Sequence, residues 1–387
     1  MEISESIKYV GVNDRKTDLF EGQYPVPNGI SYNSYVILDE KTAVTDTVDA
    51  DFFDEWISNV KTALSGRLPD YLVVHHMEPD HSANIKKFLE VYPETVLVAS
   101  KKALEMTDAF FGEGTVKNRL EMSDGSELSL GKHSLTFVSA PMVHWPEVLV
   151  SYEKCEKILF SADAFGKFGA LDCDEEWDSE AARYYFGIVG KYGAQVQALF
   201  KKLAGFEIET ICPLHGPVLK DSISHCLKLY DIWSSYKPEK TGVFIAYASV
   251  YGNTKKAAEM LYEKLKKSGE TVEILDLSRC DMSQAVKNAF LFDRLVLATP
   301  TYNSDVFPFM RDFISRLTER SYKGRTVGLI ENGSWAVKSG DLMQKFVNDE
   351  LKNMTVLNER LSLASSLGED KAVELETLAD AILESVQ

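Results

Sequence analysis

Cysteine is scarce in this sequence, and no two cysteines form a C-x-x-C pair. The five cysteines are Cys155, Cys173, Cys212, Cys226 and Cys280. Their odd number and wide spacing argue against a disulfide scaffold, a zinc ribbon and a cysteine-held iron–sulfur or rubredoxin centre within the chain. We therefore expect a reducing, cytoplasmic environment.

Basic residues are also few relative to acidic ones. The chain has 42 lysines and arginines against 59 aspartates and glutamates, a formal charge of −17. Such a charge repels nucleic acid and anionic membrane surfaces. No apolar run approaches the roughly 18 residues of a membrane helix, and the first residues lack the basic-then-apolar pattern of a signal peptide. We expect neither nucleic acid nor a membrane as a partner.

The length of 387 residues exceeds that of one typical domain, which has about 100–200 residues. A polar stretch at 234–240 contains Pro238 and precedes an apolar segment at 243–247. We interpret this stretch as a linker. The expected domains are therefore residues 1–238 and 239–387.

The second half alternates between strand-like and helix-like segments. The expected strands are 243–247, 272–277, 294–298, 325–331 and 354–357. The expected helices are 254–267, a short one before 294, 307–319, 340–352 and 370–385. This order predicts an α/β fold with a doubly wound, five-stranded parallel sheet. Phosphate-bearing ligands of such folds bind at the carboxyl ends of the strands, beside helix N-termini.

The first half has a different pattern, in which strands come in adjacent pairs. The expected pairs are 31–38 with 42–46, and 148–152 with 157–161. Helices at 51–65 and 82–91 interleave with them. This pattern predicts a mixed α/β domain that contains hairpins.

A cluster of metal-ligand side chains follows the apolar strand 71–74. The chain there reads His75-His76-Met77-Glu78-Pro79-Asp80-His81, and we expect a helix from about Ser82. His76, Glu78 and Asp80 are two residues apart, so in an extended segment their side chains point the same way. One short loop thus directs imidazoles and carboxylates toward one place.

Three further candidates, His144, Asp163 and His215, each directly follow an apolar strand. The complete candidate set is His76, Glu78, Asp80, His81, His144, Asp163 and His215. Seven ligands suffice for two metal ions if one carboxylate bridges them. The expected ligands of one ion are His76, Glu78 and His144. The other ion would take Asp80, His81 and His215, with Asp163 between the two ions.

A single histidine beside a loop is usually structural, but four of the seven histidines of this chain fall in the pattern. We therefore favour a metal centre over seven unrelated polar residues. His75 should point to the face opposite His76, so we expect it to be structural. His133 and His225 have no partners in the pattern and keep the structural interpretation.

Three loops in the second half are candidates for a cofactor site, because each follows a strand of the predicted sheet. The sequence has no G-x-x-x-x-G-K-[ST] loop and no G-x-G-x-x-G fingerprint, which argues against a P-loop or dinucleotide site. A hydroxyl-rich turn before a helix suits a phosphate monoester such as that of FMN, although it is also a common N-cap. The candidate residues are Ser249, Val250, Tyr251, Gly252, Asn253, Thr254, Pro300, Thr301, Tyr302, Asn303, Asn332, Gly333, Ser334 and Trp335.

These motifs resemble two known families. The loop from His76 to His81 resembles the His-x-His-x-Asp-His loop of the metallo-β-lactamase fold, with Glu78 in place of the second histidine. The loops at 249–254, 299–303 and 332–335 resemble those of flavodoxin around FMN, with Tyr302 and Trp335 candidates to flank its ring. The combination resembles the flavodiiron proteins, in a minimal form that ends without a C-terminal rubredoxin module.

The resemblance implies an N-terminal metallo-β-lactamase-like αββα domain and a C-terminal flavodoxin-like domain. It implies FMN and two non-haem irons per chain, and reduction of dioxygen or nitric oxide with electrons from rubredoxin or a similar donor. It also implies a head-to-tail homodimer, or a tetramer built from it. Tyr24, Trp145 and Tyr192 are candidates to line the diatomic site. From residue types alone, zinc and manganese stay open as the metal.

Two other functions remain to be weighed. One is a lactamase-fold zinc hydrolase with an appended flavodoxin domain, which Glu78 and the flavin loops disfavour. The other is an electron carrier whose first domain only binds a partner, which the seven-residue set disfavours because a carrier needs no such site.

Overall fold

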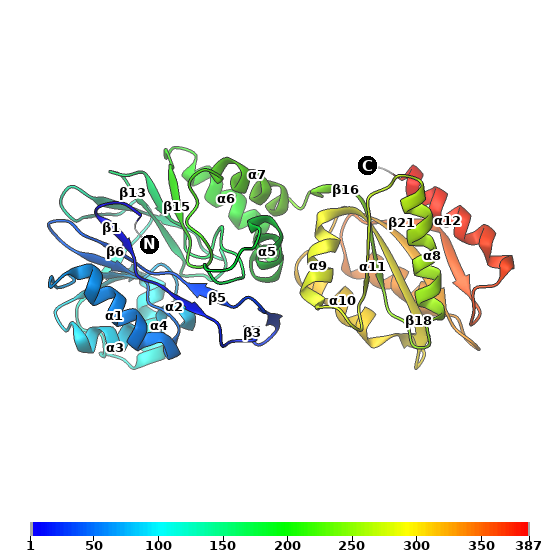
Figure 1. Ribbon diagram of the computed structural model, residues 1–387, viewed down its shortest axis with the longest axis horizontal. Coiled ribbons are helices and arrows are strands. Elements are labelled where there is room, and N and C mark those ends of the chain that lie inside the picture. Colours follow the sequence, from blue (N-terminus) through cyan, green and yellow to red (C-terminus); the bar gives the residue numbers. More distant parts are fainter. Residues whose placement is uncertain (1–2, 386–387) are drawn as a thin grey trace. The chain divides into compact units, whose positions relative to one another are not determined.

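Two sheets form the centre of the N-terminal part of the chain in the computed structural model, which describes residues 3–385 (Figure 1). The first sheet has the order β1-β6-β7-β8-β9-β10 and the second β11-β12-β13-β14-β15. The first consists of β1 (Ile7–Tyr9), β6 (Tyr35–Ile37), β7 (Ala43–Thr45), β8 (Tyr71–Val73), β9 (Val96–Ser100) and β10 (Arg119–Met122). The second consists of β11 (Glu127–Ser129), β12 (Ser134–Ser139), β13 (Leu149–Glu153), β14 (Ile158–Phe160) and β15 (Thr210–Cys212).

Short strand pairs and helices surround these sheets. The pairs are β2 (Val12–Asp14) with β5 (Ile30–Tyr32), and β3 (Leu19–Phe20) with β4 (Tyr24–Pro25). The helices are η1 (Ala50–Phe52), α1 (Phe53–Leu64), α2 (Pro79–Ser82), α3 (Ile85–Val91), α4 (Lys101–Phe111), α5 (Trp177–Tyr184), η2 (Tyr185–Val189), η3 (Gly190–Tyr192), α6 (Gly193–Leu203) and α7 (Ile223–Ser234). Figure 1 shows α1, α3 and α4 on the outside of the first sheet.

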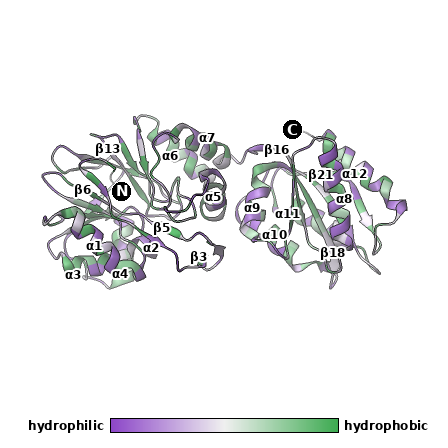
Figure 2. Ribbon diagram, viewed as in Figure 1, coloured by the Kyte–Doolittle hydropathy of each residue, from purple (hydrophilic) through white to green (hydrophobic). Residues whose placement is uncertain are grey.

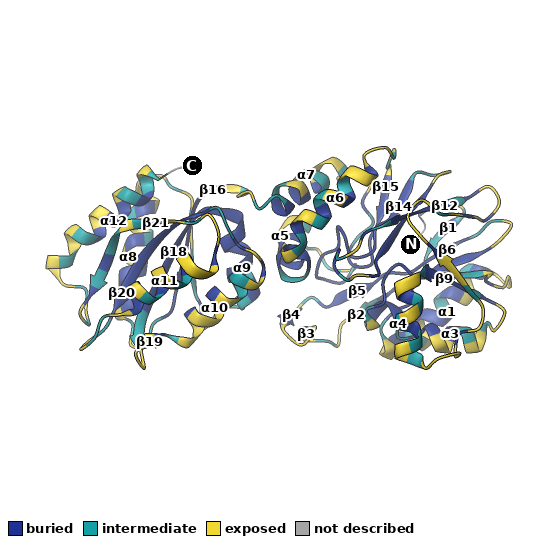
Figure 3. Ribbon diagram, turned by 180° about the vertical axis from the view of Figure 1, so that it is seen from behind, coloured by how far each residue is buried: buried dark blue, intermediate teal, exposed yellow. Residues whose placement is uncertain are grey.

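The two sheets share one apolar core. Tyr35 and Val98 of the first sheet belong to the same buried cluster as Phe137 and Phe160 of the second. Burial of this apolar area supplies the main driving force for the sheets to pack face to face. Most strand residues are buried, and exposed residues concentrate on the outer faces of the helices and on β10 and β11 (Figure 3). The expected αββα arrangement is confirmed.

Both predicted hairpins are present, with one difference. β6 pairs antiparallel with β7, and β13 with β14. The strand expected at 31–38 is divided, because β5 pairs with β2 whereas β6 joins the first sheet. Asn33 lies at the break, and its side-chain amide donates to the backbone oxygens of Pro213 and Gly216, at 2.8 Å each.

A parallel sheet with the order β17-β16-β18-β20-β21 forms the C-terminal part, with the short β19 beside β18. Its strands are β16 (Lys240–Tyr247), β17 (Val272–Asp276), β18 (Phe292–Tyr302), β19 (Asp305–Val306), β20 (Thr326–Asn332) and β21 (Thr355–Leu363). Its helices are α8 (Asn253–Lys267), α9 (Met282–Leu291), α10 (Pro308–Glu319), α11 (Ser339–Glu350), η4 (Glu369–Lys371) and α12 (Ala372–Glu384). The predicted doubly wound sheet of five parallel strands is confirmed.

The helices of this sheet are amphipathic. α8 and α12 carry hydrophobic and hydrophilic residues on different faces (Figure 2), and Leu261 and Leu378 of these helices belong to the buried cluster under the sheet. β21 is longer than the strand expected at 354–357, because it continues through the polar Glu359 and Arg360. An edge strand tolerates such residues, and here Arg360 pairs with Glu331 and Asp341.

The chain groups into two compact units. The first contains the chain up to Tyr185 together with Ala194–Tyr230, and the second contains Phe186–Gly193 and the chain from Asp231 onward. Within the second unit Phe186 stacks on Phe290, with ring centroids 4.4 Å apart. Among residues 3–385, no helix is both long enough and apolar enough to cross a membrane.

Arg325 is a structural centre of the second unit. Its buried guanidinium donates to the backbone oxygens of Phe290, Phe292 and Tyr236 at 2.7–2.8 Å. We expect Arg325→Met to destabilise this unit by about 3 kcal/mol, because buried carbonyls lose their donors. The measurement is the midpoint temperature of thermal unfolding, followed by circular dichroism. Arg316→Met is the control, since its partly exposed pair with Asp312 contributes well under about 1 kcal/mol. Equal shifts of the midpoint temperature in Arg325→Met and Arg316→Met would contradict this role of Arg325.

Candidate metal and cofactor sites

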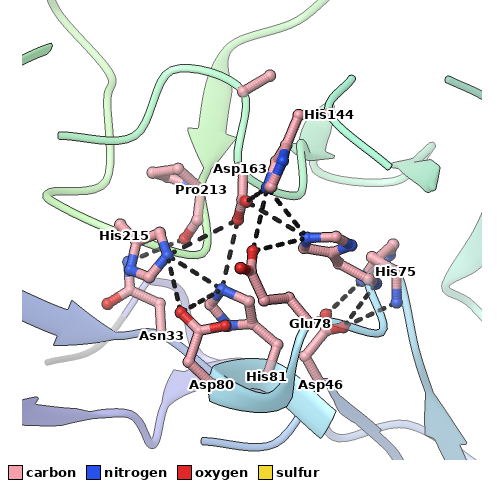
Figure 4. A network of polar contacts seen from close by, with 12 residues as sticks. Asn33, Asp46, His75, Glu78, Asp80, His81, His144, Asp163, Pro213 and His215 are labelled. Carbon is pink, nitrogen blue, oxygen red and sulfur yellow. Dashed lines mark hydrogen bonds and ion pairs between the residues drawn. The ribbon is translucent and has the colours of Figure 1, made fainter. Parts of the chain in front are cut away.

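The segment after β8 changes from extended to helical at Pro79. Glu78 has φ −59° and ψ 139°, and α2 begins at the next residue. Proline favours the first helical position because its φ is already helical and it has no N–H to leave unpaired. The expectation that His76, Glu78 and Asp80 share one extended face is therefore wrong for Asp80. The helical turn directs Asp80 and His81 to a second group of side chains (Figure 4).

The structure brings all seven predicted metal ligands together in two adjacent groups. One group consists of His76, Glu78, His144 and Asp163, and the other of Asp80, His81 and His215. Within each group the candidate ligand atoms lie within 4.8 Å of one another. Four of the residues follow β8, and His144, Asp163 and His215 follow β12, β14 and β15. All except Glu78 are buried. Their role as ligands stays a prediction.

The carboxylate of Asp163 lies between the two groups. Its Oδ2 atom is 2.9 Å from His144 Nε2 and 3.5 Å from His76 Nε2. Its Oδ1 atom is 3.3 Å from His81 Nε2 and 3.8 Å from His215 Nε2. One oxygen therefore faces each group, which is the arrangement that a carboxylate bridging two metal ions requires.

Outer hydrogen bonds fix the direction of two imidazoles. His76 Nδ1 lies 2.8 Å from Glu147 Oε1, and His215 Nδ1 lies 2.8 Å from the backbone oxygen of Ser31. Each acceptor assigns the proton to Nδ1, so the Nε2 lone pair points inward. Sequence reasoning missed Glu147. The available signal was its position three residues after the candidate ligand His144.

The donor set fits a pair of metal ions. The Nε2 atoms of His81 and His215 are 3.0 Å apart, and those of His76 and His144 are 3.3 Å apart. Two ring nitrogens this close need a cation between them, either a proton or a metal ion. Oδ1 of Asp80 is buried without a hydrogen-bond partner among the described residues. Oδ2 of Asp80 and Oδ1 of Asp163 are buried as well, and each has only long contacts of 3.3 Å or more to imidazole nitrogens. Such orphaned acceptors are costly in a folded protein, and a coordinated cation satisfies them.

The electrostatics of the cluster favour ionised carboxylates. Burial alone would lower the pKa of His144, but its hydrogen bonds to Asp163 and Glu78 outweigh burial and raise this pKa to about 9. Burial opposes ionisation of Asp163 as well, yet the charge of His76 and hydrogen bonds from His144 and His81 hold its pKa well below the usual range. A metal ion would replace the protons that the imidazoles hold here.

Two further residues that sequence reasoning missed face the cluster. The Tyr184 hydroxyl is buried without a hydrogen-bond partner among the described residues, and its ring centroid is 5.5 Å from that of His215. Burial, followed by the charges of Asp163, Glu78 and Asp80, raises its pKa. Glu21, in the β3–β4 turn, has its pKa raised to about 7 by loss of hydration and by the charge of Glu78, although its outer edge is exposed.

The three residues predicted to line a diatomic site lie at different distances from the cluster. The Trp145 ring is 5.3 Å from that of His76. Tyr24 is buried and packs on Phe168, which in turn packs on Tyr184. Tyr192 lies in η3, within the segment that groups with the second unit. Tyr184 lies beside the predicted ligand His215 instead, although no motif in the sequence marks this tyrosine.

The second unit contains a cavity of about 420 Å³ at the carboxyl ends of β16, β18 and β20. All predicted cofactor residues line it except Gly252, and Ser304, Ala336 and Ser365 line it as well. Gly252 instead makes the turn into α8, with φ 91° and its N–H bonded to Ser249. Tyr251 and Trp335 lie at the rim, 93% and 95% exposed.

The cavity fits FMN by two features. α8 begins without a side-chain cap, so its first N–H groups and the hydroxyls of Ser249 and Thr254 are available to a phosphate. The Asn332 side chain joins two of the loops, because its amide donates to the backbone oxygen of Ser365 and its oxygen accepts from the Ser365 N–H. The placement of the phosphate at the start of α8, and of the flavin ring between Tyr302 and Trp335, stays a prediction.

Comparisons with known proteins agree with both sites. Residues 30–216 match the ODP family of β-lactamases, and residues 244–362 match a flavodoxin domain. A nitric oxide reductase of Moorella thermoacetica is 30% identical over 90% of this chain and 89% of its own length. The rubredoxin oxygen:oxidoreductase of Desulfovibrio gigas superposes with a TM-score of 0.92 at 25% identity, covering 100% of this chain and 98% of that one. A flavodiiron protein of Giardia intestinalis gives 0.91 at 25% identity, covering 99% and 95%.

The two units and their sites thus define a metalloflavoprotein oxidoreductase with a lactamase-like and a flavodoxin-like domain. The chain belongs to the flavodiiron protein family. FMN and a non-haem diiron centre are accordingly its cofactors.

We expect His76→Ala and Asp163→Ala to lose iron while they keep FMN, because the two sites are built from different units. Asp163→Ala should lower the occupancy of both irons, since its two oxygens face both groups. Elemental analysis and flavin absorbance of the purified variants measure this. His225→Ala is the control, because His225 pairs with Asp178 outside the cluster. Full iron content in Asp163→Ala would contradict the assignment.

We also expect metal uptake by the iron-free protein to depend on pH. The pKa of His144 is raised to about 9, so below that pH an entering ion must displace its proton. Apparent affinity should fall roughly tenfold per pH unit for each displaced proton as the pH drops from 9 to 7. Anaerobic Fe²⁺ titration measures it. An affinity that is flat over this range would show that the imidazoles are already neutral.

Proposed function

We propose that this protein reduces dioxygen, nitric oxide or both at the seven-residue cluster, with electrons that arrive from rubredoxin or a similar donor through FMN. The observation that carries the proposal is the carboxylate of Asp163, which offers one oxygen to each group. Names of relatives, among them nitric oxide reductase and rubredoxin-oxygen oxidoreductase, support this pair of substrates.

The carboxylate-rich ligand set supports iron over zinc. Glu78, Asp80 and Asp163 supply hard oxygen ligands beside four imidazoles, whereas histidine-rich sites of this fold suit zinc. When bound, reduced FMN would supply two electrons and the iron pair two more, and the irons would be the place where a diatomic molecule is reduced. The zinc hydrolase is the disfavoured alternative, since it has no use for a flavin cavity.

The residues of the chain itself hold and orient this centre. Glu147 fixes His76 through Nδ1 and also accepts from the backbone N–H of Met77 at 2.9 Å. Outer carboxylates of this kind raise the basicity of a ligating imidazole and fix its tautomer. Asn33 holds the loop of His215 through Pro213 and Gly216. The ligands are thereby placed before a metal or a substrate arrives.

Two acidic groups are placed to supply protons. Reduction of dioxygen to two waters consumes four protons, and reduction of two nitric oxide molecules to nitrous oxide and one water consumes two. Glu21, with a pKa raised to about 7, contacts Glu78 and has an exposed outer edge. The Tyr184 hydroxyl is a second donor on the buried side, near His215. Near neutral pH the Tyr184 hydroxyl holds its proton, and Glu21, with a pKa close to that pH, can both give up and take up a proton.

The organisation of the protein is part of this proposal. Residues 1–238 would form the diiron domain and residues 239–387 the FMN domain, which the family matches at 30–216 and 244–362 support. Electron transfer falls steeply with distance, which supports a head-to-tail homodimer, or a tetramer of two such dimers, that brings the flavin of one chain to the irons of another. The five unpaired cysteines support a reducing, cytoplasmic location.

Turnover with reduced rubredoxin tests the function. We expect the iron- and FMN-loaded protein to consume dioxygen, nitric oxide or both, and His76→Ala to lose this activity while its FMN is still reduced by the donor. Dioxygen is the first substrate to test. Failure of wild type with both gases, although iron, FMN and flavin reduction are intact, would overturn the proposal.

A further inference from the structure

A second group of metal-ligand side chains lies in the first unit, outside the seven-residue cluster. It consists of His133, in the turn before β12, Glu153, at the end of β13, and Cys155, in the turn that follows. One candidate ligand atom from each lies within 4.8 Å of the others. Imidazole, carboxylate and thiolate together are a ligand set that divalent zinc-type ions accept.

This group lies at the opposite end of the β13–β14 hairpin from the seven-residue cluster. His144 and Glu147 precede the first residue of β13, and Asp163 follows the last residue of β14. Glu153 and Cys155 lie at the turn between these strands. At about 3.4 Å per residue, the five residues of β13 separate the two places by roughly 14 Å. No single side chain can therefore reach both the seven-residue cluster and the group at His133.

The charge around His133 favours a cation. His133 Nδ1 is 3.0 Å from Glu153 Oε1, and its Nε2 is 3.8 Å from Glu156 Oε1. Its backbone N–H donates to Asp39. Glu153 and Glu156 have ion pairs only with His133 among the described residues, and Glu153 is fully buried. Glu153 also accepts from the backbone N–H groups of Cys155 and Glu156, at 2.8 and 2.6 Å, so the turn holds its carboxylate beside His133. Two carboxylates thus share one imidazole, with no lysine or arginine partner among the described residues.

We propose that His133, Glu153 and Cys155 bind a thiophilic divalent metal ion of the zinc class. The ligand atoms would be Nδ1 of His133, Oε1 of Glu153 and Sγ of Cys155. The ion replaces the proton on Nδ1 and the proton of the thiol, both of which leave to solvent. Nε2–H of His133 then points toward Glu156, which Ser6 holds through a 2.8 Å hydrogen bond. A carboxylate behind a ligating imidazole is the usual outer partner of such a site.

The distances are compatible with one tetrahedral ion. Bond lengths of about 2.0–2.3 Å place ligand atoms roughly 3.3–3.8 Å apart. His133 and Glu153 are already slightly closer than this, at 3.0 Å. Cys155 is exposed, so its side chain is free to rotate the remaining distance. Its exposure also leaves the fourth position to water. Such an ion would join the β11–β12 turn to the β13–β14 turn.

Cobalt titration tests this site in the protein with its iron and FMN in place. Thiolate bound to Co²⁺ gives an intense near-ultraviolet charge-transfer band, read as a difference spectrum against the flavin. The seven-residue cluster contains no cysteine, so Co²⁺ bound there gives no such band. We expect wild type to develop the band with about one Co²⁺ per chain, and Zn²⁺ to remove it.

Cys155→Ser should lose the band, and Cys280→Ser, in the other unit, should keep it. Cys155 is exposed, so its substitution does not disturb packing. A second readout uses wild type alone, in which Zn²⁺ should slow alkylation of Cys155 by iodoacetamide at least tenfold, followed by mass spectrometry. Absence of the band, its survival in Cys155→Ser, or an unchanged alkylation rate would each overturn the proposal. None of these outcomes depends on the proposed diatomic reduction.

Discussion

Three carboxylates and four imidazoles converge on one largely buried place, and this concentration of charge is the constraint on which the rest of the first unit depends. Burying carboxylates without cations is costly. In the metal-free chain the imidazoles offset part of this penalty by holding protons. Burial would lower the pKa of His144, but its hydrogen bonds to Asp163 and Glu78 raise this pKa to about 9. Two metal ions offset the penalty more fully, because Asp163 presents one oxygen to each group and Asp80 has a buried oxygen without a hydrogen-bond partner among the described residues.

The two facing sheets hold these side chains in fixed positions. Ligands come from the loops after β8, β12, β14 and β15, so no single element could place them. Outer contacts then remove the remaining freedom. Asp46 accepts from the backbone N–H of His75 at 2.7 Å and contacts its ring, which fixes the start of the ligand loop. Asn33 performs the same task for the loop that carries His215. Such preorganisation lets a small substrate bind without rearrangement of the site.

Much of this arrangement could be predicted from the sequence, because strand ends and residue types are local features. The ends of apolar strands located His144, Asp163 and His215, and alternation of strands and helices located the flavin loops. The doubly wound sheet of the second half follows from the same alternation. For the first half the pattern predicts only a mixed α/β domain with hairpins, and the αββα arrangement comes from the resemblance to the metallo-β-lactamase fold. The predicted geometry of Asp80 is wrong, because α2 begins at Pro79 and not at about Ser82. The tendency of proline to start a helix outweighs the extended pattern. Tyr184, Glu21 and Glu147 act through contacts made only after folding. The grouping of Phe186–Gly193 with the second unit likewise depends on packing against Phe290.

The most direct test of the central claim is the metal and flavin content of protein purified without oxygen, by elemental analysis and visible absorbance. A cluster that holds two ions across Asp163, together with a flavin cavity in the other unit, predicts two irons and one FMN per chain. Two zincs with no flavin would contradict the account and return the chain to the hydrolase interpretation.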